Sequence, residues 1–106
     1  RQIVAMVREA GAAEIWLRLA SPPIVMPCFL GIDTPTQSEL LLNRAFAGER
    51  LAETPPAARA SSPEAIDWVR RFVGADQLRY LSQDGLRRAT FERPFCMGCM
   101  DGRYPV

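Results

Sequence analysis

Histidine is absent from all 106 residues of the chain. Its imidazole is the commonest metal ligand among side chains and the commonest general base near neutral pH. The absence therefore excludes histidine from any metal site or proton-transfer step built within this chain. Whatever chemistry the chain supports must use sulfur and oxygen.

Long apolar runs and an excess of charge of one sign are also missing. No stretch is long enough to span a bilayer, and no secretory apolar segment is present. The 13 basic and 12 acidic residues are interspersed and leave a net charge of +1. No basic stripe points to nucleic acid. We therefore expect a cytoplasmic protein with neither a membrane nor a nucleic-acid partner.

The hydrophobic fraction of 48% is typical of a folded chain, and the length allows one small domain. A helical pattern starts directly at Arg1, with no residue before it to cap the helix, so we expect that the chain is a fragment of a larger domain. Gly11 is suited to end this helix. Its apolar face comprises Ile3, Val4, Val7 and Ala10.

Residues 15–20 alternate in polarity and predict a β-strand. Trp16 and Ala20 are apolar as well, which favours a strand buried on both faces. A helix, a glycine-containing turn and a strand form half of a βαβ unit, so a mainly parallel sheet is expected. The three prolines of "SPPIVMPC" then predict a stiff, extended loop at the carboxyl edge of that strand. In open α/β sheets, ligands bind at this edge.

The rest of the chain reads as helices, one short strand and a tail. Thr36 and Glu39 match a capping box at the start of a second helix. Residues 44–62, rich in alanine, proline and charge, predict a mobile insertion. The last sixteen residues predict a loop. The remaining predicted elements are a helix over 61–74, a strand over 77–82 and a helix over 82–90.

Cys28, Cys96 and Cys99 are the only cysteines. Cys96 and Cys99 form a C-x-x-C pair, which in a chain without secretory features is more often metal-binding or redox-active than structural. Two-residue spacing lets two thiolates face one centre, and Gly98 between them relieves steric demand. Zinc and iron–sulfur clusters both accept this spacing and both usually have four ligands. The residues alone leave zinc and iron open, and redox thiols are the less favoured alternative.

Several long stretches resemble the glutamine phosphoribosylpyrophosphate amidotransferase family. The matching strings are "RQIVAMVREAGAAEIWLRLASPPIVMPCFLGIDTPTQSEL", "VGADQLRYLSQDGL" and "FCMGCMDGRYPV". They cover nearly the whole chain except residues 44–62. The resemblance implies an α/β fold in which residues 1–106 are the C-terminal portion of a phosphoribosyltransferase domain. That portion would be a parallel sheet flanked by helices, ending in an irregular cysteine-containing tail.

The resemblance also implies the activity of the parent enzyme. That enzyme is a glycosyltransferase of purine synthesis, and it uses glutamine-derived ammonia and phosphoribosylpyrophosphate to make 5-phosphoribosylamine. One branch of the family carries a structural [4Fe–4S] cluster. Its pattern places three ligands at Cys28, Cys96 and Cys99 and the fourth outside this chain. Leu40 falls where apolar side chains line the ammonia passage, although a plain core role is an equal alternative. A homo-oligomer is expected.

The family's catalytic motifs are missing from these 106 residues. The acidic pair with its Arg-Gly-Thr-Thr run, which binds Mg²⁺ and pyrophosphate in the family, would end before Arg1. The nucleophilic cysteine of the glutaminase domain is absent too. We therefore predict that the chain alone is inactive. The alternative is a non-catalytic metal-binding or interaction module derived from that enzyme.

Overall fold

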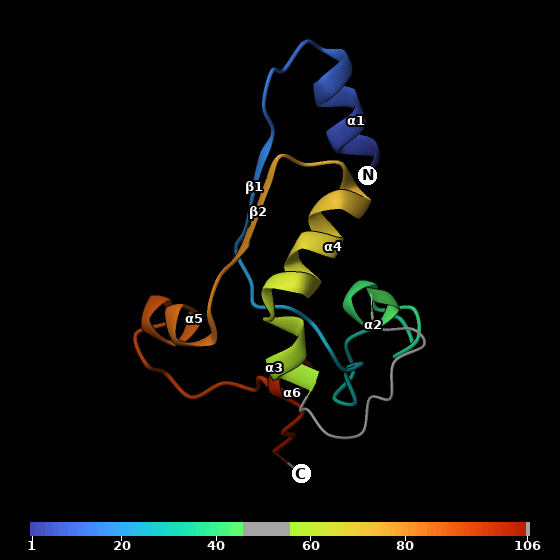
Figure 1. The fold of residues 1–106 in the computed structure, drawn as a ribbon. Helices are drawn as coiled ribbons and strands as arrows, with labels where there is room; N and C mark the ends of the chain where they lie inside the picture. Colours follow the sequence, from blue (N-terminus) through green and yellow to red (C-terminus); the bar gives the residue numbers. More distant parts are fainter. Residues whose placement is uncertain (46–55, 106) are drawn as a thin grey trace.

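The computed structural model describes residues 1–45 and 56–105 of the chain. Within these ranges the protein forms six helices and two strands, which run from α1 at one end of the molecule to α6 at the other (Figure 1). In chain order they are α1 (Gln2–Glu9), β1 (Trp16–Leu19), α2 (Leu41–Ala45), α3 (Pro56–Ala60), α4 (Pro63–Val73), β2 (Gln77–Tyr80), α5 (Gln83–Ala89) and α6 (Gly98–Asp101).

The two strands pair in parallel, with Trp16 opposite Gln77 and Leu19 opposite Tyr80. Helix α4 precedes β2 and packs on the sheet, so the predicted parallel arrangement with a covering helix is confirmed. A parallel pair needs a long crossover, and residues 20–76 provide it. Because the strands are parallel, the loop after β1 and the chain after β2 leave from the same edge of the sheet.

The core lies between α4 and the sheet. The buried side chains of α4 are Ala65 and Val69, and Val69 is 2% exposed. Ile66 and Val73 of the same helix are partly buried against them. The buried cluster draws on five parts of the chain: Val25, Leu42, Ala60, Ala65 with Val69, and Leu78.

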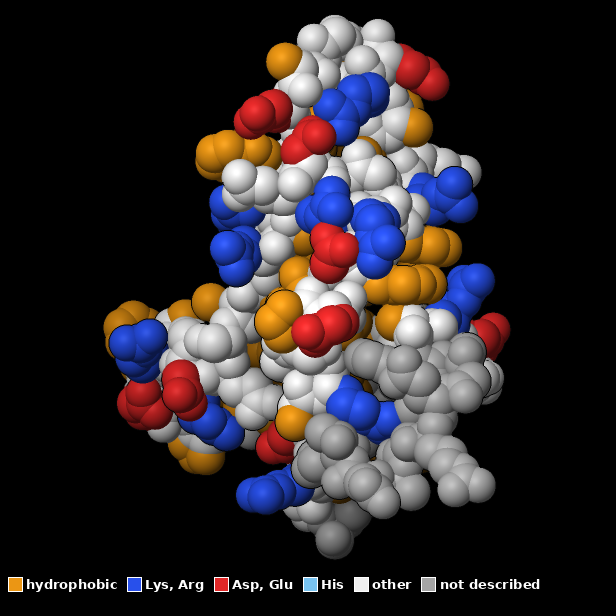
Figure 2. Space-filling view, viewed as in Figure 1, with side chains coloured by type: hydrophobic (Ala, Val, Ile, Leu, Met, Phe, Trp, Pro, Cys, Tyr) orange, Lys and Arg blue, Asp and Glu red, His pale blue; other side chains and the backbone are white. Residues whose placement is uncertain are grey.

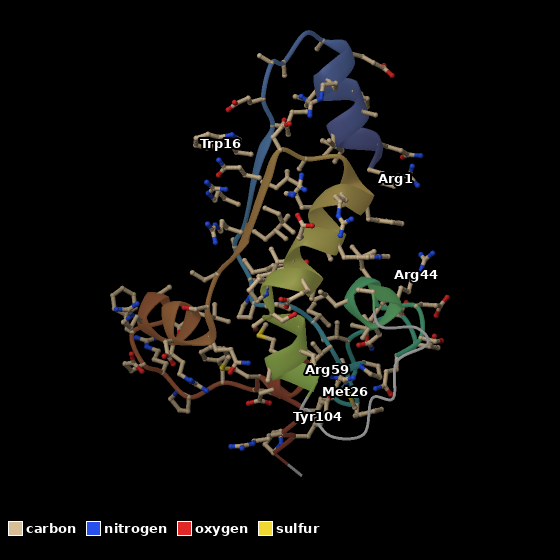
Figure 3. The ribbon with its side chains drawn as sticks, viewed as in Figure 1. Arg1, Trp16, Met26, Arg44, Arg59 and Tyr104 are labelled. Carbon is tan, nitrogen blue, oxygen red and sulfur yellow. The ribbon has the colours of Figure 1, made fainter. Side chains whose placement is uncertain are left out.

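The prediction that β1 is buried on both faces is wrong. Trp16 is 56% exposed and points away from α4 (Figure 3). Successive side chains of a strand point to opposite faces, and α4 covers only the face of Leu17 and Leu78. On the other face, the guanidinium of Arg18 lies 5.5 Å from the centre of the Trp16 ring, in cation–π contact.

The first two helices differ in part from their predictions. Gly11 has a φ of +98° and ends α1 as expected, but Val4 is the only buried residue of that helix. The predicted second helix is shorter, because a turn occupies residues 37–39 and α2 begins at Leu41. The capping interaction itself forms, since the Thr36 N–H donates to Glu39 Oε2 over 3.0 Å.

Capping side chains begin α4 and α5, and a glycine ends α4. Ser62 Oγ accepts from the Ala65 N–H at the start of α4, and Gly74, with a φ of +84°, ends that helix. Ser82 Oγ accepts in the same way from the Gly85 N–H at the start of α5. These side-chain bonds satisfy donors that have no partner within the helix.

The two segments predicted to be irregular both contain a short helix. Of the proposed mobile insertion 44–62, residues 46–55 lie outside the described residues and its mobility stays a prediction. Its C-terminal flank contains α3, where Ala60 is 2% exposed and belongs to the buried cluster. The tail is not entirely a loop. It folds into α6, because the Met97 carbonyl accepts from the Asp101 N–H and holds one helical turn.

Charges on the face seen in Figure 2 are mixed, with acidic and basic side chains side by side and no dominant sign. This agrees with the interspersed charges of the sequence. None of the helices in residues 1–45 and 56–105 is long and apolar enough to cross a bilayer.

Candidate functional site

The loop that follows β1 is fixed to the C-terminal tail by main-chain hydrogen bonds. The Val25 and Met26 N–H groups both donate to the Cys99 carbonyl, over 2.8 and 3.1 Å. The Val25 carbonyl accepts from Asn43 Nδ2 of α2 over 3.1 Å. Its side chain, 1% exposed, is buried in the core. The loop predicted from its prolines is therefore held in place by backbone hydrogen bonds and by the buried side chain of Val25.

Cys28 lies at the end of this loop and is partly buried. Its N–H donates to Thr34 Oγ1 over 2.8 Å. Its Sγ accepts from the Leu30 N–H over 3.4 Å. Main-chain N–H groups directed at sulfur stabilise negative charge on a thiolate, as occurs around cysteine ligands of iron–sulfur clusters. The Cys28 sulfur thus faces a main-chain N–H of its own loop.

The C-x-x-C pair lies at α6. Cys96 is exposed and Cys99 is partly buried, and Met97 between them is buried. The Gly98 N–H donates to Cys96 Sγ over 3.4 Å, which repeats the arrangement seen at Cys28. A main-chain N–H within the C-x-x-C turn therefore faces the Cys96 sulfur.

The charges of Cys28 and Cys96 affect the pKa of the Cys99 thiol. Burial raises the pKa of the Cys99 thiol above its usual value, and the neighbouring Cys28, Cys96 and Asp101 raise it further. Negative charge on any of these groups opposes ionisation of Cys99, so the thiols are close enough to interact. A cation held between them would reverse this effect, because metal binding displaces thiol protons.

The sulfur atoms do not form a closed ligand set. In the described part of the chain, no group of three or more Cys, Asp or Glu side chains could hold a metal ion. All three cysteines are free thiols. The structure thus brings together the peptide segments that carry Cys28 and Cys99, while metal ligation by the three cysteines stays a prediction.

Tyr104 is a residue of this region that the sequence analysis missed. Its hydroxyl donates to the Pro27 carbonyl, 77 positions away. Its ring lies 5.0 Å from that of Phe29, centre to centre. Figure 3 places Tyr104 beside Met26 at the end of the molecule remote from α1. A tyrosine five residues after a cysteine carries no sequence signal, because nothing local reveals the loop that it contacts.

Leu40 is buried, at 7% exposed, and lines a pocket of about 230 Å³ below the loop. The other lining residues are Ser21, Pro22, Ile24, Leu41, Leu42 and Tyr80. Most of these side chains are apolar, so the pocket offers few hydrogen-bonding groups to a ligand. Its position at the carboxyl edge of the strands agrees with the expected location of a ligand cavity.

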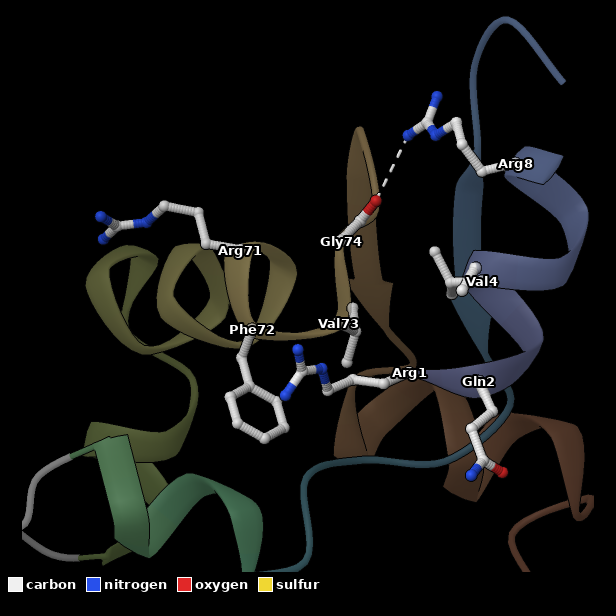
Figure 4. Close-up of a pocket in the computed structure, with 9 residues that line it drawn as sticks. Arg1, Gln2, Val4, Arg8, Arg71, Phe72, Val73 and Gly74 are labelled. Carbon is white, nitrogen blue, oxygen red and sulfur yellow. Dashed lines mark hydrogen bonds between the residues drawn. The ribbon is translucent and has the colours of Figure 1, made fainter. Parts of the chain in front are cut away.

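A second pocket, of about 630 Å³, lies at the opposite end between α1 and the end of α4 (Figure 4). Arg8 closes one side of it by donating to the Gly74 carbonyl over 3.3 Å. The Arg1 guanidinium stacks on the Phe72 ring, 5.2 Å from its centre. None of the cysteine segments lines this pocket, so it is separate from the candidate site.

No protein-family model matches the chain. Its sequence is, however, 41% identical to amidophosphoribosyltransferase from Mycobacterium leprae over 109 aligned residues, which cover all of this chain and 17% of that protein. The chloroplastic amidophosphoribosyltransferase 2 of Arabidopsis thaliana is 37% identical over 99% of the chain and 16% of its own length. The chain is homologous to a segment of amidophosphoribosyltransferases.

Solved structures agree with this relationship. The glutamine phosphoribosylpyrophosphate amidotransferase from B. subtilis, complexed with ADP and GMP, superposes with a TM-score of 0.67 at 35% identity. The match covers 96% of this chain and 20% of that one. A structure described as the allosteric regulatory enzyme of purine biosynthesis gives the same TM-score at 36% identity. The parallel sheet and flanking helices therefore match a segment of these enzymes, and the chain spans no more than about a fifth of their length.

Proposed function

We propose that this chain acts as part of an amidophosphoribosyltransferase, which makes 5-phosphoribosylamine from phosphoribosylpyrophosphate and glutamine-derived ammonia. Relatives of that name are 34–41% identical along the chain. The chain holds no histidine, and its three thiols lie in one region away from the pocket at α1. The catalytic groups and the Mg²⁺ site are accordingly assigned to residues outside these 106.

The role proposed for this segment is to hold a structural [4Fe–4S] cluster through Cys28, Cys96 and Cys99, with a fourth cysteine from outside the chain. The observation that carries the proposal is the pair of hydrogen bonds from the Val25 and Met26 N–H groups to the Cys99 carbonyl. It joins the two cysteine-bearing segments through the backbone alone, without needing a metal.

The donor set is consistent with this assignment. Three thiols without a nitrogen ligand suit an iron–sulfur cluster or zinc, and N–H donors already face two of the sulfurs. A set of three is one ligand short of the usual four, so the proposal takes the fourth ligand from outside these residues. When bound, the cluster would supply a covalent staple between the loop and the tail. Closing so long a loop limits the freedom of the unfolded chain.

Leu40 is proposed as part of the wall of the ammonia passage. An apolar wall holds neutral ammonia without offering a base that would bind it or an acid that would protonate it. Replacing Leu40 with Gln in the complete protein should lower the glutamine-dependent rate more than the rate with free ammonia added. Equal losses in the two assays would assign Leu40 to the core only.

The test of the cluster is anaerobic purification of the protein as its gene encodes it, followed by assays of iron, sulfide and zinc. We expect iron and sulfide in similar amounts, lost when any of the three cysteines is replaced by Ser. Exposure to air should release the iron and oxidise the thiols. Stoichiometric zinc without sulfide would replace the cluster with a zinc site, and no metal at all would remove the proposal.

A further inference from the structure

Cys28 is fixed on both sides of its own peptide unit. The Cys28 N–H donates a hydrogen bond to Thr34 Oγ1. The carbonyl of the preceding residue, Pro27, accepts a hydrogen bond from the Tyr104 hydroxyl. The first contact is local, but the second comes from the tail that carries the C-x-x-C pair. Tyr104 is therefore a side-chain link between the two cysteine-bearing segments, in addition to the backbone bonds at Cys99.

The ring of Tyr104 also contacts the C-x-x-C turn. Gly98 is buried, and a Cβ built on it would lie 2.5 Å from the Tyr104 ring. The ring thus lies directly against the backbone between Cys96 and Cys99. Its other neighbour is the ring of Phe29, the residue after Cys28. One side chain therefore contacts both residues that flank Cys28 and the residue that precedes Cys99.

We propose that Tyr104 is a positioning residue for the three-cysteine site, whose hydroxyl and ring set the separation of the Cys28 loop and the C-x-x-C turn. The inference rests on the proposed cluster, because positioning ligands matters only if a metal is bound. The contacts that Tyr104 makes with the two segments do not require a metal. Groups that orient metal ligands without binding the metal commonly change metal affinity by about 10- to 100-fold when removed.

The first test measures the placement of the thiols in the metal-free protein. A Cys96→Ser background leaves Cys28 and Cys99, and a glutathione redox buffer reports their effective concentration through the fraction of the Cys28–Cys99 disulfide, identified by peptide mapping. Tyr104→Phe removes one hydrogen bond and should lower this concentration about fivefold. Tyr104→Leu also removes the ring and should lower it further.

The chain offers a matched control in its only other tyrosine, Tyr80 at the end of β2. Tyr80→Phe should leave the disulfide equilibrium unchanged. A role of Tyr104 in general stability alone would make the disulfide yield follow the melting temperature across the variants. We expect instead a fall in disulfide yield in Tyr104→Phe without a matching fall in melting temperature. Unchanged disulfide formation in Tyr104→Phe and Tyr104→Leu would overturn the proposal.

The second test uses the loaded protein, purified without oxygen. Tyr104→Leu should release iron in air about tenfold faster than the unaltered protein, whereas Tyr80→Phe should not. Equal release rates would show that Tyr104 does not hold the ligands. If the unaltered protein contains no iron and no sulfide, the cluster fails as a function, while the disulfide measurement still decides the role of Tyr104.

Discussion

Truncating Val25 tests whether the loop that carries Cys28 is anchored by the core. Val25 lies in a segment without helix or strand, yet its side chain is 1% exposed and belongs to the buried cluster with Leu42, Val69 and Leu78. Val25→Ala removes two methyl groups and leaves both hydrogen bonds of the Val25 main chain, to the Cys99 carbonyl and from Asn43 Nδ2, in place. The change therefore isolates the packing of the side chain.

The expected loss follows from the burial. Transfer of two methyl groups to water costs about 1.6 kcal/mol. A cavity that does not collapse adds up to about 1 kcal/mol. The free energy of unfolding should thus fall by about 2 kcal/mol, which lowers the melting temperature of a domain of this size by about 10 °C. Far-UV circular dichroism during heating or urea titration measures both quantities.

The control is the same substitution on α1, where Val7 is 42% exposed. Val7→Ala should change the free energy of unfolding by less than about 0.5 kcal/mol. A Val25→Ala variant that loses no more stability than Val7→Ala would refute the reasoning. It would mean that the loop packs on the core without contributing to it, and the link between the core and the cysteine site would be lost.

Three further changes test the elements that support the site. Gly74→Ala should cost about 1 kcal/mol from the positive φ alone, because the new Cβ would meet only Val4 Cγ1 at an ordinary 3.8 Å; thermal unfolding would show it. Ser62→Ala should cost about 1 kcal/mol in urea titration, since the Ala65 N–H loses its acceptor. The pKa of Asp76 is lowered by the Ile15 N–H and then by Arg8, so its contribution to stability is present above its ordinary pKa and lost as pH falls through the lowered one. Asp76→Asn should therefore flatten the acid limb of the stability profile, and an unchanged limb would contradict the assignment.

Local signals in the sequence predicted the elements that depend on neighbouring residues. Ser62 with Pro63 marks the start of α4, and Gly74 marks its end, because each acts through backbone groups within one turn. The same holds for Ser82 at α5 and for Gly11 after α1. Cap chemistry is local, so a reader of the sequence can place it without knowing the fold.

The burial of a side chain depends on elements that are distant in the sequence, and the burial predicted for β1 was wrong. Trp16 is apolar, which suggested a strand covered on both sides, but coverage depends on whether another element packs on each face. In the described residues α4 covers one face only. Conversely, the prolines around Val25 indicated an extended loop correctly, yet nothing in "SPPIVMPC" shows that its valine would be among the most buried side chains.

The candidate site combines both kinds of information. The C-x-x-C spacing is local and identified Cys96 and Cys99, and family resemblance added Cys28. What brings these segments together are contacts over long sequence distances: the Cys99 carbonyl with Val25 and Met26, and the Tyr104 hydroxyl with Pro27. The loop-closure entropy of such contacts is offset by burial of Val25 in the core. A site held in this way should keep its cysteine segments together before a metal arrives, so metal binding should order the sulfur atoms without refolding the chain.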